Sequence, residues 1–274
     1  MHTAQDLNVK EIDDPEIAKW DPAFTKFLIN AFTPVFKLWF RPEVRGLETF
    51  PPTGGVLLVS NHSGGILPPD WNAFAPSFYG KFGYDRPLYT LAHYGVFMTP
   101  LRASLGRLGV IHASPEKAAK VLRAGAVLLD FPGGDYDAFR PTRRRNVIDF
   151  GGHTGYIRTA VEAGAPIVPM VSIGAQETQI FVARGDRLAK RLGLNRIRLD
   201  ILPVTIGFPF GLTSTIPANM PFPAKVVYQV LEPIDVVAQF GKQADVHRVD
   251  AHVRSVMQTA LDGLARQRRF PILG

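Results

Sequence analysis

The chain alternates short runs of consecutive apolar residues with polar loops and longer segments of helical spacing. Three of the runs, Val56–Val59, Ala126–Phe131 and Ile167–Val171, have the length of buried strands. A helix is expected between the second and third runs, at about Gly155–Ala163. Another is expected between the first and second runs, from the start signal Ser114-Pro115 through Arg123. This order predicts an α/β fold with a central mixed, partly parallel sheet flanked by helices.

The first long helical pattern lies near the N-terminus. Asp21 as N-cap and Pro22 at the first helical position predict a helix over 21–40, which Pro34 should kink or divide in two. Apolar residues surround most of this helix, so it must be buried in lipid or against the protein's own core. Aromatic residues interleaved with lysines favour the plane of a bilayer's headgroup boundary. We therefore expect amphipathic membrane-associating helices at 1–42 and a second domain at 43–274.

The C-terminal part of the chain is less regular. A basic helix is expected within Gln176–Gly193, and the stretch Leu202–Pro223, rich in Gly, Pro and aromatic residues, is expected to be irregular, with membrane contact as one interpretation. A final helix beginning near Val246 has the spacing of ordinary core packing.

Composition narrows the classes of function. The 31 Lys and Arg residues against 24 Asp and Glu residues give a formal charge of +7, which favours an anionic partner such as a phospholipid surface, a nucleotide or nucleic acid. With no cysteine, thiol nucleophiles, disulfides and Cys-ligated metal sites are excluded. The N-terminus shows no secretory signal, and no uncharged apolar run reaches the roughly 18 residues of a membrane-spanning helix.

Two loops that follow predicted strands carry candidate chemistry. The first, Ser60–Asp70, presents His62 just past a strand end, where an open α/β sheet keeps its ligands. A histidine there is a candidate general base, although a lone loop histidine is more often a hydrogen-bonded structural residue. The second, Pro132-Gly133-Gly134-Asp135, has two glycines that allow backbone amides to approach an oxygen closely.

These motifs resemble the ordered blocks of the glycerolipid acyltransferase superfamily, which includes lysophosphatidate, monoacylglycerol and diacylglycerol acyltransferases. The resemblance rests on Asn61-His62 with Asp70, on Phe131–Asp135, on Ala163–Met170, and on Phe222–Lys225 followed by Glu232–Ile234. It covers roughly residues 44–236 and implies that the domain at 43–274 is an acyltransferase domain of that superfamily's α/β fold.

The sequence departs from the family pattern in two places. The usual first block has four residues between His and Asp, whereas seven separate His62 from Asp70. The usual third block reads Phe-Pro-Glu-Gly, whereas Gly133 stands in place of the glutamate. The Pro-Gly-Gly form resembles the monoacylglycerol and diacylglycerol acyltransferase branch, so the departures bear on the acceptor more than on the transferase class.

The resemblance gives each candidate residue a role. His62 would take a proton from an acceptor hydroxyl that attacks an acyl thioester, and the imidazolium would protonate the departing thiolate. Asp70 would hold the second ring nitrogen, which requires the intervening loop to fold back through its glycines and prolines. Asp130, Asp135 and Asp137 are rival partners for His62.

Donors for the oxyanion and the phosphate are the remaining candidates. Backbone amides of Gly64, Gly65, Gly133 or Gly134 would stabilise the tetrahedral oxyanion, although these glycines equally suit turns. Asp135 and the cluster Arg140, Arg143, Arg144 and Arg145 complete the predicted substrate-binding set, with Arg140 the first choice for a phosphate. A solvated basic loop against anionic headgroups is the alternative for the arginines.

We expect a peripheral or monotopic membrane enzyme on the cytoplasmic face. It would move a long acyl chain from an acyl-coenzyme A or acyl-carrier-protein thioester to a glycerolipid hydroxyl, above all that of a lysophospholipid such as 1-acylglycerol-3-phosphate. The alternatives are an acylglycerol or other alcohol acceptor, or a non-catalytic lipid-binding protein. We expect acyl-coenzyme A as co-substrate, no cofactor or metal, an anionic membrane surface as partner, and no nucleic acid. A hydrolase is disfavoured, because neither a Gly-x-Ser-x-Gly nor a His-Glu-x-x-His motif occurs.

Overall fold

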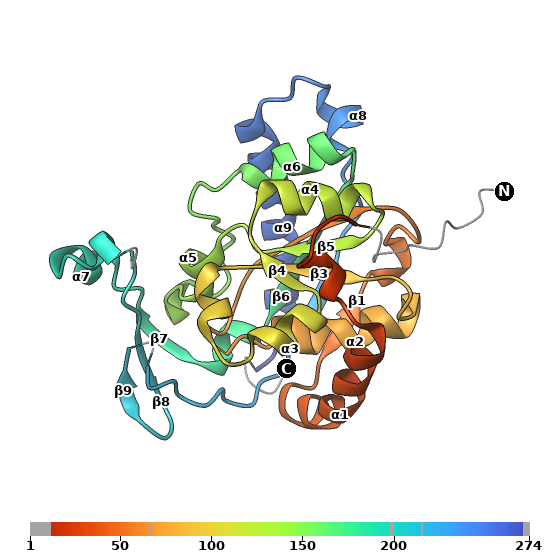
Figure 1. The fold of residues 1–274 in the computed structure, drawn as a ribbon. Coiled ribbons are helices and arrows are strands. Elements are labelled where there is room, and N and C mark those ends of the chain that lie inside the picture. Colours follow the sequence, from red (N-terminus) through yellow and green to blue (C-terminus); the bar gives the residue numbers. More distant parts are fainter. Residues whose placement is uncertain (1–11, 66, 198–199, 215, 271–274) are drawn as a thin grey trace.

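The computed structural model describes residues 12–270, except for residues 66, 198–199 and 215 (Figure 1). The strands are β1 (Glu43–Arg45), β2 (Val56–Ser60), β3 (Leu88–Ala92), β4 (Val110–His112), β5 (Val127–Asp130), β6 (Ile167–Ile173), β7 (Ile180–Ala183), β8 (Val204–Gly207), β9 (Gly211–Thr213) and β10 (Val227–Val230). The helices are α1 (Pro22–Phe40), α2 (Asp70–Phe82), α3 (Arg102–Arg107), α4 (Pro115–Arg123), α5 (Gly134–Ala138), α6 (Gly155–Ala163), α7 (Asp186–Arg191), α8 (Val236–Phe240) and α9 (Val246–Gln267).

Seven strands form the central sheet, in the order β1-β10-β6-β2-β5-β3-β4. Strand β2 pairs in parallel with β5 and β6, β3 pairs in parallel with β5 and β4, and only β10 runs antiparallel to its neighbour β6. In Figure 1, α4 and α6 lie above this sheet and α1, α2 and α3 below it. The expectation of a mixed, partly parallel sheet flanked by helices is confirmed.

The core lies on both faces of this sheet because helices cover both. All five residues of β2 and all seven of β6 are buried, as continuous apolar strands of a parallel sheet require. One cluster of buried side chains joins the sheet to α2 and α9. It includes Phe74 and Phe78 of α2, Tyr228 of β10, and Met257 and Leu261 of α9. The C-terminal ends of β2 and β5 are thereby fixed at the centre of the molecule.

Helix α1 begins as expected, with the Asp21 side chain accepting a hydrogen bond from the Phe24 amide at 2.9 Å. Pro34 does not divide the helix, which runs unbroken to Phe40. The reason is that the carbonyl deprived of its partner, on Asn30, lies on an exposed turn where water can satisfy it. Of the predicted segment 1–42, residues 1–11 lie outside the described residues. Helix α1 buries Thr25, Ile29 and Phe40 and leaves much of its remaining apolar surface exposed.

The stretch expected to be irregular contains two strands. Within 202–223, β8 and β9 form a hairpin that pairs with β7 in a separate three-stranded antiparallel sheet, the small sheet hereafter. Each strand has only three or four residues, one of which is glycine, so their periodicity is too short to detect in the sequence. No helix in the described part of the chain combines the length and apolarity needed to cross a bilayer.

Candidate active site

The loop after β2 folds back on itself to bring its two ends together. Gly64 and Gly65 both have positive φ angles, 88° and 64°, which side chains rarely adopt. A Cβ atom on Gly64 would lie 2.8 Å from the Pro69 ring, so the loop packs directly against its own return. The buried Asn61 side chain fixes the start of the loop, because its Oδ1 accepts from the Ser172 amide of β6 at 2.8 Å. The predicted reversal of this loop is present.

His62 and Asp70 meet across that loop. The Nδ1 atom of His62 lies 2.7 Å from Oδ2 of Asp70, and the same carboxylate oxygen accepts the Ser63 amide at 3.0 Å. Asp70 is 2% exposed and is the first residue of α2, where the helix dipole favours a negative charge. His62 thus follows the end of β2, and Asp70 begins α2.

The imidazole of His62 is held by a second contact on its face. The Phe131 ring stacks on it with a centroid distance of 4.4 Å and an interplanar angle of 25°. The side chain remains 19% exposed, and its Nε2 has no hydrogen-bond partner among the described residues. The tautomer in which Nδ1 donates to Asp70 leaves Nε2 as an acceptor, which is the form that a general base needs.

Beneath the loop lies a buried ion pair that sequence reasoning did not assign. Asp137 accepts the His62 amide at 2.6 Å through one carboxylate oxygen and pairs with Arg140 through the other. Burial raises the pKa of Asp137, and the Arg140 guanidinium and the His62 amide oppose that rise. Arg140 in turn donates to the His62 carbonyl and to Ser63 Oγ, both at 3.0 Å. The pair therefore holds the backbone that carries the histidine.

This arrangement explains the glycine that departs from the family pattern. A Cβ atom on Gly133 would lie 2.5 Å from Cβ of Asp137, a distance that real side chains do not tolerate. A glutamate at position 133 is incompatible with Asp137 in this place. The signal for Asp137 in the sequence is therefore the substitution at Gly133 itself, four residues earlier.

Most of the glycine amides expected to bind an oxyanion are already used. The amide of Gly64 donates to Gln176 Oε1 at 3.2 Å, that of Gly65 to the Ala138 carbonyl at 3.2 Å, and that of Gly134 to the Phe131 carbonyl at 2.9 Å. Among the four predicted donors, only the Gly133 amide has no acceptor within the described residues. The structure thus gives Gly64, Gly65 and Gly134 the turn-forming role and leaves Gly133 as the candidate donor.

The predicted arginine cluster divides into buried and exposed members. Arg140, the first choice for a phosphate, is 2% exposed and its donors are committed to Asp137, the His62 loop and the Arg145 carbonyl. This burial corrects its expected role from substrate contact to support of the site. Arg143 and Arg144 are exposed on the turn after α5, Arg145 pairs with Glu177 at 3.2 Å, and the Asp135 side chain points into solvent.

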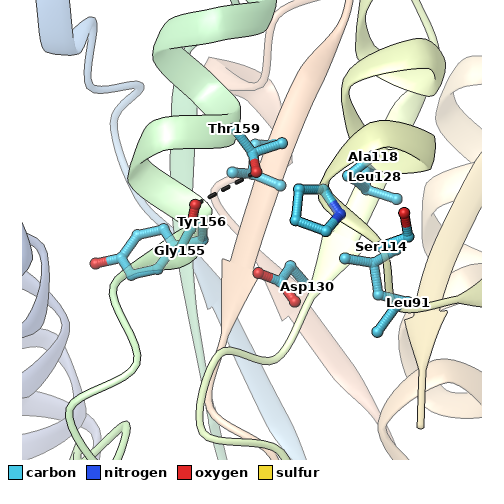
Figure 2. Close-up of a pocket in the computed structure, with 11 residues that line it drawn as sticks. Leu91, Ser114, Ala118, Leu128, Asp130, Gly155, Tyr156 and Thr159 are labelled. Atoms are coloured by element: carbon cyan, nitrogen blue, oxygen red, sulfur yellow. Dashed lines mark hydrogen bonds between the residues drawn. The ribbon is translucent and has the colours of Figure 1, made fainter. Parts of the chain in front are cut away.

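A separate cavity of about 190 Å³ opens between α4 and α6 (Figure 2). Apolar side chains of β2, β3 and β5 line it together with Ser114, Tyr156 and Thr159, and Figure 2 shows the Asp130 carboxylate within it. Burial raises the pKa of Asp130 to about 6. The Nδ1 atom of His62 contacts Asp70, and His62 does not line this cavity, so Asp70 rather than Asp130 is its partner. The described residues contain no group of three His, Cys, Asp or Glu side chains arranged to hold a metal ion.

Part of the chain matches a family model, and its fold resembles that of a solved structure. The family model described as Acyltransferase matches residues 41–173, a range that contains His62, Asp70 and the Phe131–Asp135 loop. The crystal structure of the 1-acyl-sn-glycerophosphate (LPA) acyltransferase PlsC from Thermotoga maritima is similar in fold, with a TM-score of 0.56 and 17% sequence identity over 93% of this chain and 84% of that chain.

Similar sequences extend beyond the matched range. A relative from Mycobacterium leprae (strain TN), named only as an uncharacterized protein, is 29% identical over 93% of this chain and 69% of its own length. A protein named DGAT1/2-independent enzyme synthesizing storage lipids is 26% identical in Bos taurus, over 85% of this chain and 67% of its own. The protein of that name in Homo sapiens is 27% identical over 79% of this chain and 63% of its own. The ordered motifs, the family match and these relatives support a place for the chain in the glycerolipid acyltransferase superfamily.

Proposed function

We propose that this acyltransferase moves a long acyl chain from an acyl thioester to a hydroxyl group of a glycerolipid, with His62 as general base and Asp70 as the residue that positions it. The observation that carries the proposal is the 2.7 Å contact between His62 Nδ1 and Asp70 Oδ2, which leaves Nε2 outward and unpartnered within the described chain. Abstraction of a hydroxyl proton requires such an accessible ring nitrogen.

The chemistry needs no protein nucleophile, which suits a chain without cysteine. Nε2 of His62 takes the proton as the acceptor oxygen bonds to the thioester carbonyl carbon. The resulting tetrahedral oxyanion collapses, the carbon–sulfur bond breaks, and the imidazolium returns the proton to the thiolate. Asp70 stabilises the imidazolium between these steps, as an aspartate does in a catalytic triad. We assign stabilisation of the oxyanion to the Gly133 amide, the free donor among the predicted four.

The acceptor we favour is an acylglycerol rather than a lysophospholipid. Arg140 was the principal argument for a phosphate, and its guanidinium is buried and committed within the protein. The relatives whose printed name refers to storage lipids span most of this chain, which supports a neutral acceptor. Lysophosphatidate stays a candidate because Arg143 and Arg144, on the turn after α5, are exposed.

We further propose that residues 1–42 associate with the membrane through the exposed side of α1. Phe27, Phe32, Val35 and Leu38 are all exposed on this helix, while Lys26 and Lys37 supply cations beside them. A surface helix with this pattern lies in the headgroup plane of a bilayer. The domain at 43–274 then carries the chemistry, with acyl-coenzyme A or an acyl-carrier protein as the source of the thioester.

The test is acceptor-dependent thiol release from long-chain acyl-coenzyme A in the presence of vesicles. Diacylglycerol, monoacylglycerol, lysophosphatidate and lysophosphatidylcholine are supplied separately, to wild type, to His62→Ala and to the control His247→Ala, whose side chain is exposed at the start of α9. We expect release with an acylglycerol that His62→Ala lowers by roughly 10²–10⁴-fold and that the control leaves unchanged.

Each other outcome has a definite meaning. Release with lysophosphatidate alone would restore the phosphate-bearing acceptor. Equal release by wild type and His62→Ala would remove His62 as the base. Release with an acyl-carrier-protein thioester but not with acyl-coenzyme A would change the donor and leave the mechanism intact. Vesicle binding without turnover on any donor or acceptor would favour the lipid-binding alternative.

A further inference from the structure

The outer face of the small sheet is apolar, where an antiparallel sheet at a surface is usually polar. Such a sheet normally packs its apolar face inward and presents polar residues to water. Here the paired residues Ile180, Ile206 and Leu212 form one cross-strand row, and they are 44%, 43% and 68% exposed. The neighbouring row joins Phe181, Thr205 and Thr213, and its Phe181 and Thr205 side chains are buried.

The exposed row continues around the edge of the sheet. Val182 lies beside it at a bulge in β7, and Phe208 and Phe210 lie at the tip of the β8–β9 hairpin, all three exposed. We call these residues with Ile180, Ile206 and Leu212 the apolar face of the small sheet. Single exposed apolar side chains are ordinary, whereas a contiguous patch marks a surface that binds something.

The opposite face of the small sheet contacts the candidate site. The Phe181 ring packs edge-on against Phe139 with a centroid distance of 5.9 Å, and a Cβ atom on Gly65 would lie 2.9 Å from the Phe181 ring. The Phe181 amide also donates to Thr142 Oγ1 at 2.8 Å. The small sheet therefore has the His62 loop on one side and the apolar face on the other.

Cations follow the small sheet at the end opposite its hairpin tip. Arg187, Lys190 and Arg191 are exposed on α7, which follows β7 directly, and within the described residues none of the three forms an ion pair. If two copies of the chain met through this face by a two-fold axis, these cations would be brought toward their own equivalents. An anionic surface is the complementary partner.

The segment that follows the β8–β9 hairpin links the small sheet to α1. The Met220 amide donates to the Phe208 carbonyl at 2.8 Å, and the Trp39 indole of α1 donates to the Pro221 carbonyl at 2.9 Å. The segment leaving the hairpin is thus tied to both elements. Figure 1 shows α1 and the β8–β9 hairpin along the same, lower side of the molecule.

We propose that the apolar face of the small sheet docks on a bilayer containing anionic lipid and inserts its hairpin tip, as a second membrane contact beside α1. The inference rests on the proposed function in that a lipid acceptor must reach the His62 loop from a membrane. Docking through this face places the membrane against the sheet whose inner side packs on Gly65, so lipid is delivered at the site's own edge.

A chain with no cysteine allows the contact to be read at single positions. In full-length protein, Leu212→Cys carries an environment-sensitive fluorophore, and Ser255→Cys, exposed on α9, carries the same label as a control. We expect blue-shifted, brighter emission from the Leu212→Cys label on phosphatidylcholine vesicles containing phosphatidylglycerol, and no change from the control label. An unchanged Leu212→Cys label on vesicles that the protein demonstrably binds would overturn the proposal.

Substitutions test the apolar and the cationic contributions to membrane binding separately. The double variant Ile206→Ser with Leu212→Ser should lower the vesicle partition coefficient by about tenfold or more, because half-exposed apolar side chains lose their burial in lipid. Arg187→Gln with Arg191→Gln should also lower it about tenfold on anionic vesicles. The matched control, Arg158→Gln with Lys242→Gln near α6 and α8, removes the same charge from the upper side in Figure 1 and should leave binding unchanged.

The readouts separate this inference from the proposed function. Vesicle binding and label emission do not depend on turnover, so both stand if no acyl transfer is detected. Conversely, thiol release from detergent-dispersed substrates should be equal in wild type and in the Ile206→Ser, Leu212→Ser variant. A Leu212→Cys label that shifts with protein concentration without lipid, together with a dimer mass in solution, would replace the bilayer by a second copy and overturn the proposal.

Discussion

Both the central sheet and the small sheet are rich in apolar residues, but these residues are buried in the first and exposed on the outer face of the second. In β2, every side chain from Val56 to Ser60 is buried, because helices cover both faces of a parallel sheet. In the small sheet, Ile206 and Leu212 are exposed, because the rest of the protein covers only the opposite face. The apolar residues of the central sheet hold the fold together, whereas those on the outer face of the small sheet are available to a partner. Apolar character alone therefore does not tell a core position from a docking position.

The largest expected effect lies at the C-terminal edge of the central sheet. Asp70→Asn should lower kcat by roughly 10³–10⁴-fold with little change in KM, because an amide no longer fixes the tautomer that leaves Nε2 of His62 as acceptor. Steady-state thiol release measures both constants. Vesicle binding should be unaffected, since it belongs to the other sheet. A parallel loss of folding in urea would show instead that Asp70 is chiefly a structural residue.

The next effect lies at the border between the two sheets. Arg140→Gln should destabilise the fold by about 3–5 kcal/mol, because it leaves the Asp137 carboxylate buried without its partner. The exposed Arg143→Gln is the matched control and should change the free energy of unfolding by less than about 0.5 kcal/mol. Urea denaturation measures both. If Arg140→Gln keeps full stability and raises KM for lysophosphatidate alone, then Arg140 contacts substrate after all.

A third prediction tests the comparison directly with one substitution in each sheet. Leu57→Ala in β2 should cost about 2–5 kcal/mol of unfolding free energy, the usual range for a buried leucine. Leu212→Ala in β9 should cost less than about 0.5 kcal/mol, because its side chain is exposed. Thermal or chemical unfolding in the absence of lipid decides it. Equal costs would mean that Leu212 is covered in solution and that the two sheets do not differ as described.

The smallest effect concerns Asp130, the acidic residue at the end of β5. Burial raises the pKa of Asp130 from 3.8 to about 6, so the folded state holds its proton over a range in which the unfolded chain has lost it. Stability contributed by Asp130 therefore falls as pH rises from about 4 to about 6. Asp130→Asn should gain about 1–3 kcal/mol at pH 7.5 and almost nothing at pH 4. Unfolding at both pH values checks it, and an equal gain at each would assign the effect to packing.

The parts of the fold that were predictable are those with strong local signals. Helix α6 has the predicted bounds, Gly155–Ala163, and β2 extends the predicted run by one residue. The loop between His62 and Asp70 was expected to fold back because Asp70 was expected to reach His62, and its glycines and prolines allow the bend. These outcomes depend on neighbours within about ten residues, which is the range over which sequence patterns inform.

The features that were missed depend on contacts distant in sequence. Arg140 and Arg143 are alike in the sequence, and only the position of Asp137 under the His62 loop separates the buried one from the exposed one. The small sheet was missed because β7 and β8 are joined by a long connection and each is stabilised by pairing rather than by its own periodicity. Phe131 was recognised as part of a motif, but its stacking on His62 requires the completed fold.

The position of Asp70 at the start of α2 bears on how His–Asp sites of this kind can be found in sequences. His62 is delivered by the end of a strand and Asp70 by the first turn of a helix, so the frame that sets their separation is the packing of those two elements. The residues between them need only close the gap, and seven do so here where four are usual in the family. A search pattern with fixed spacing discards chains of this kind. One that anchors each residue to its element boundary and leaves the spacer length open would retain them.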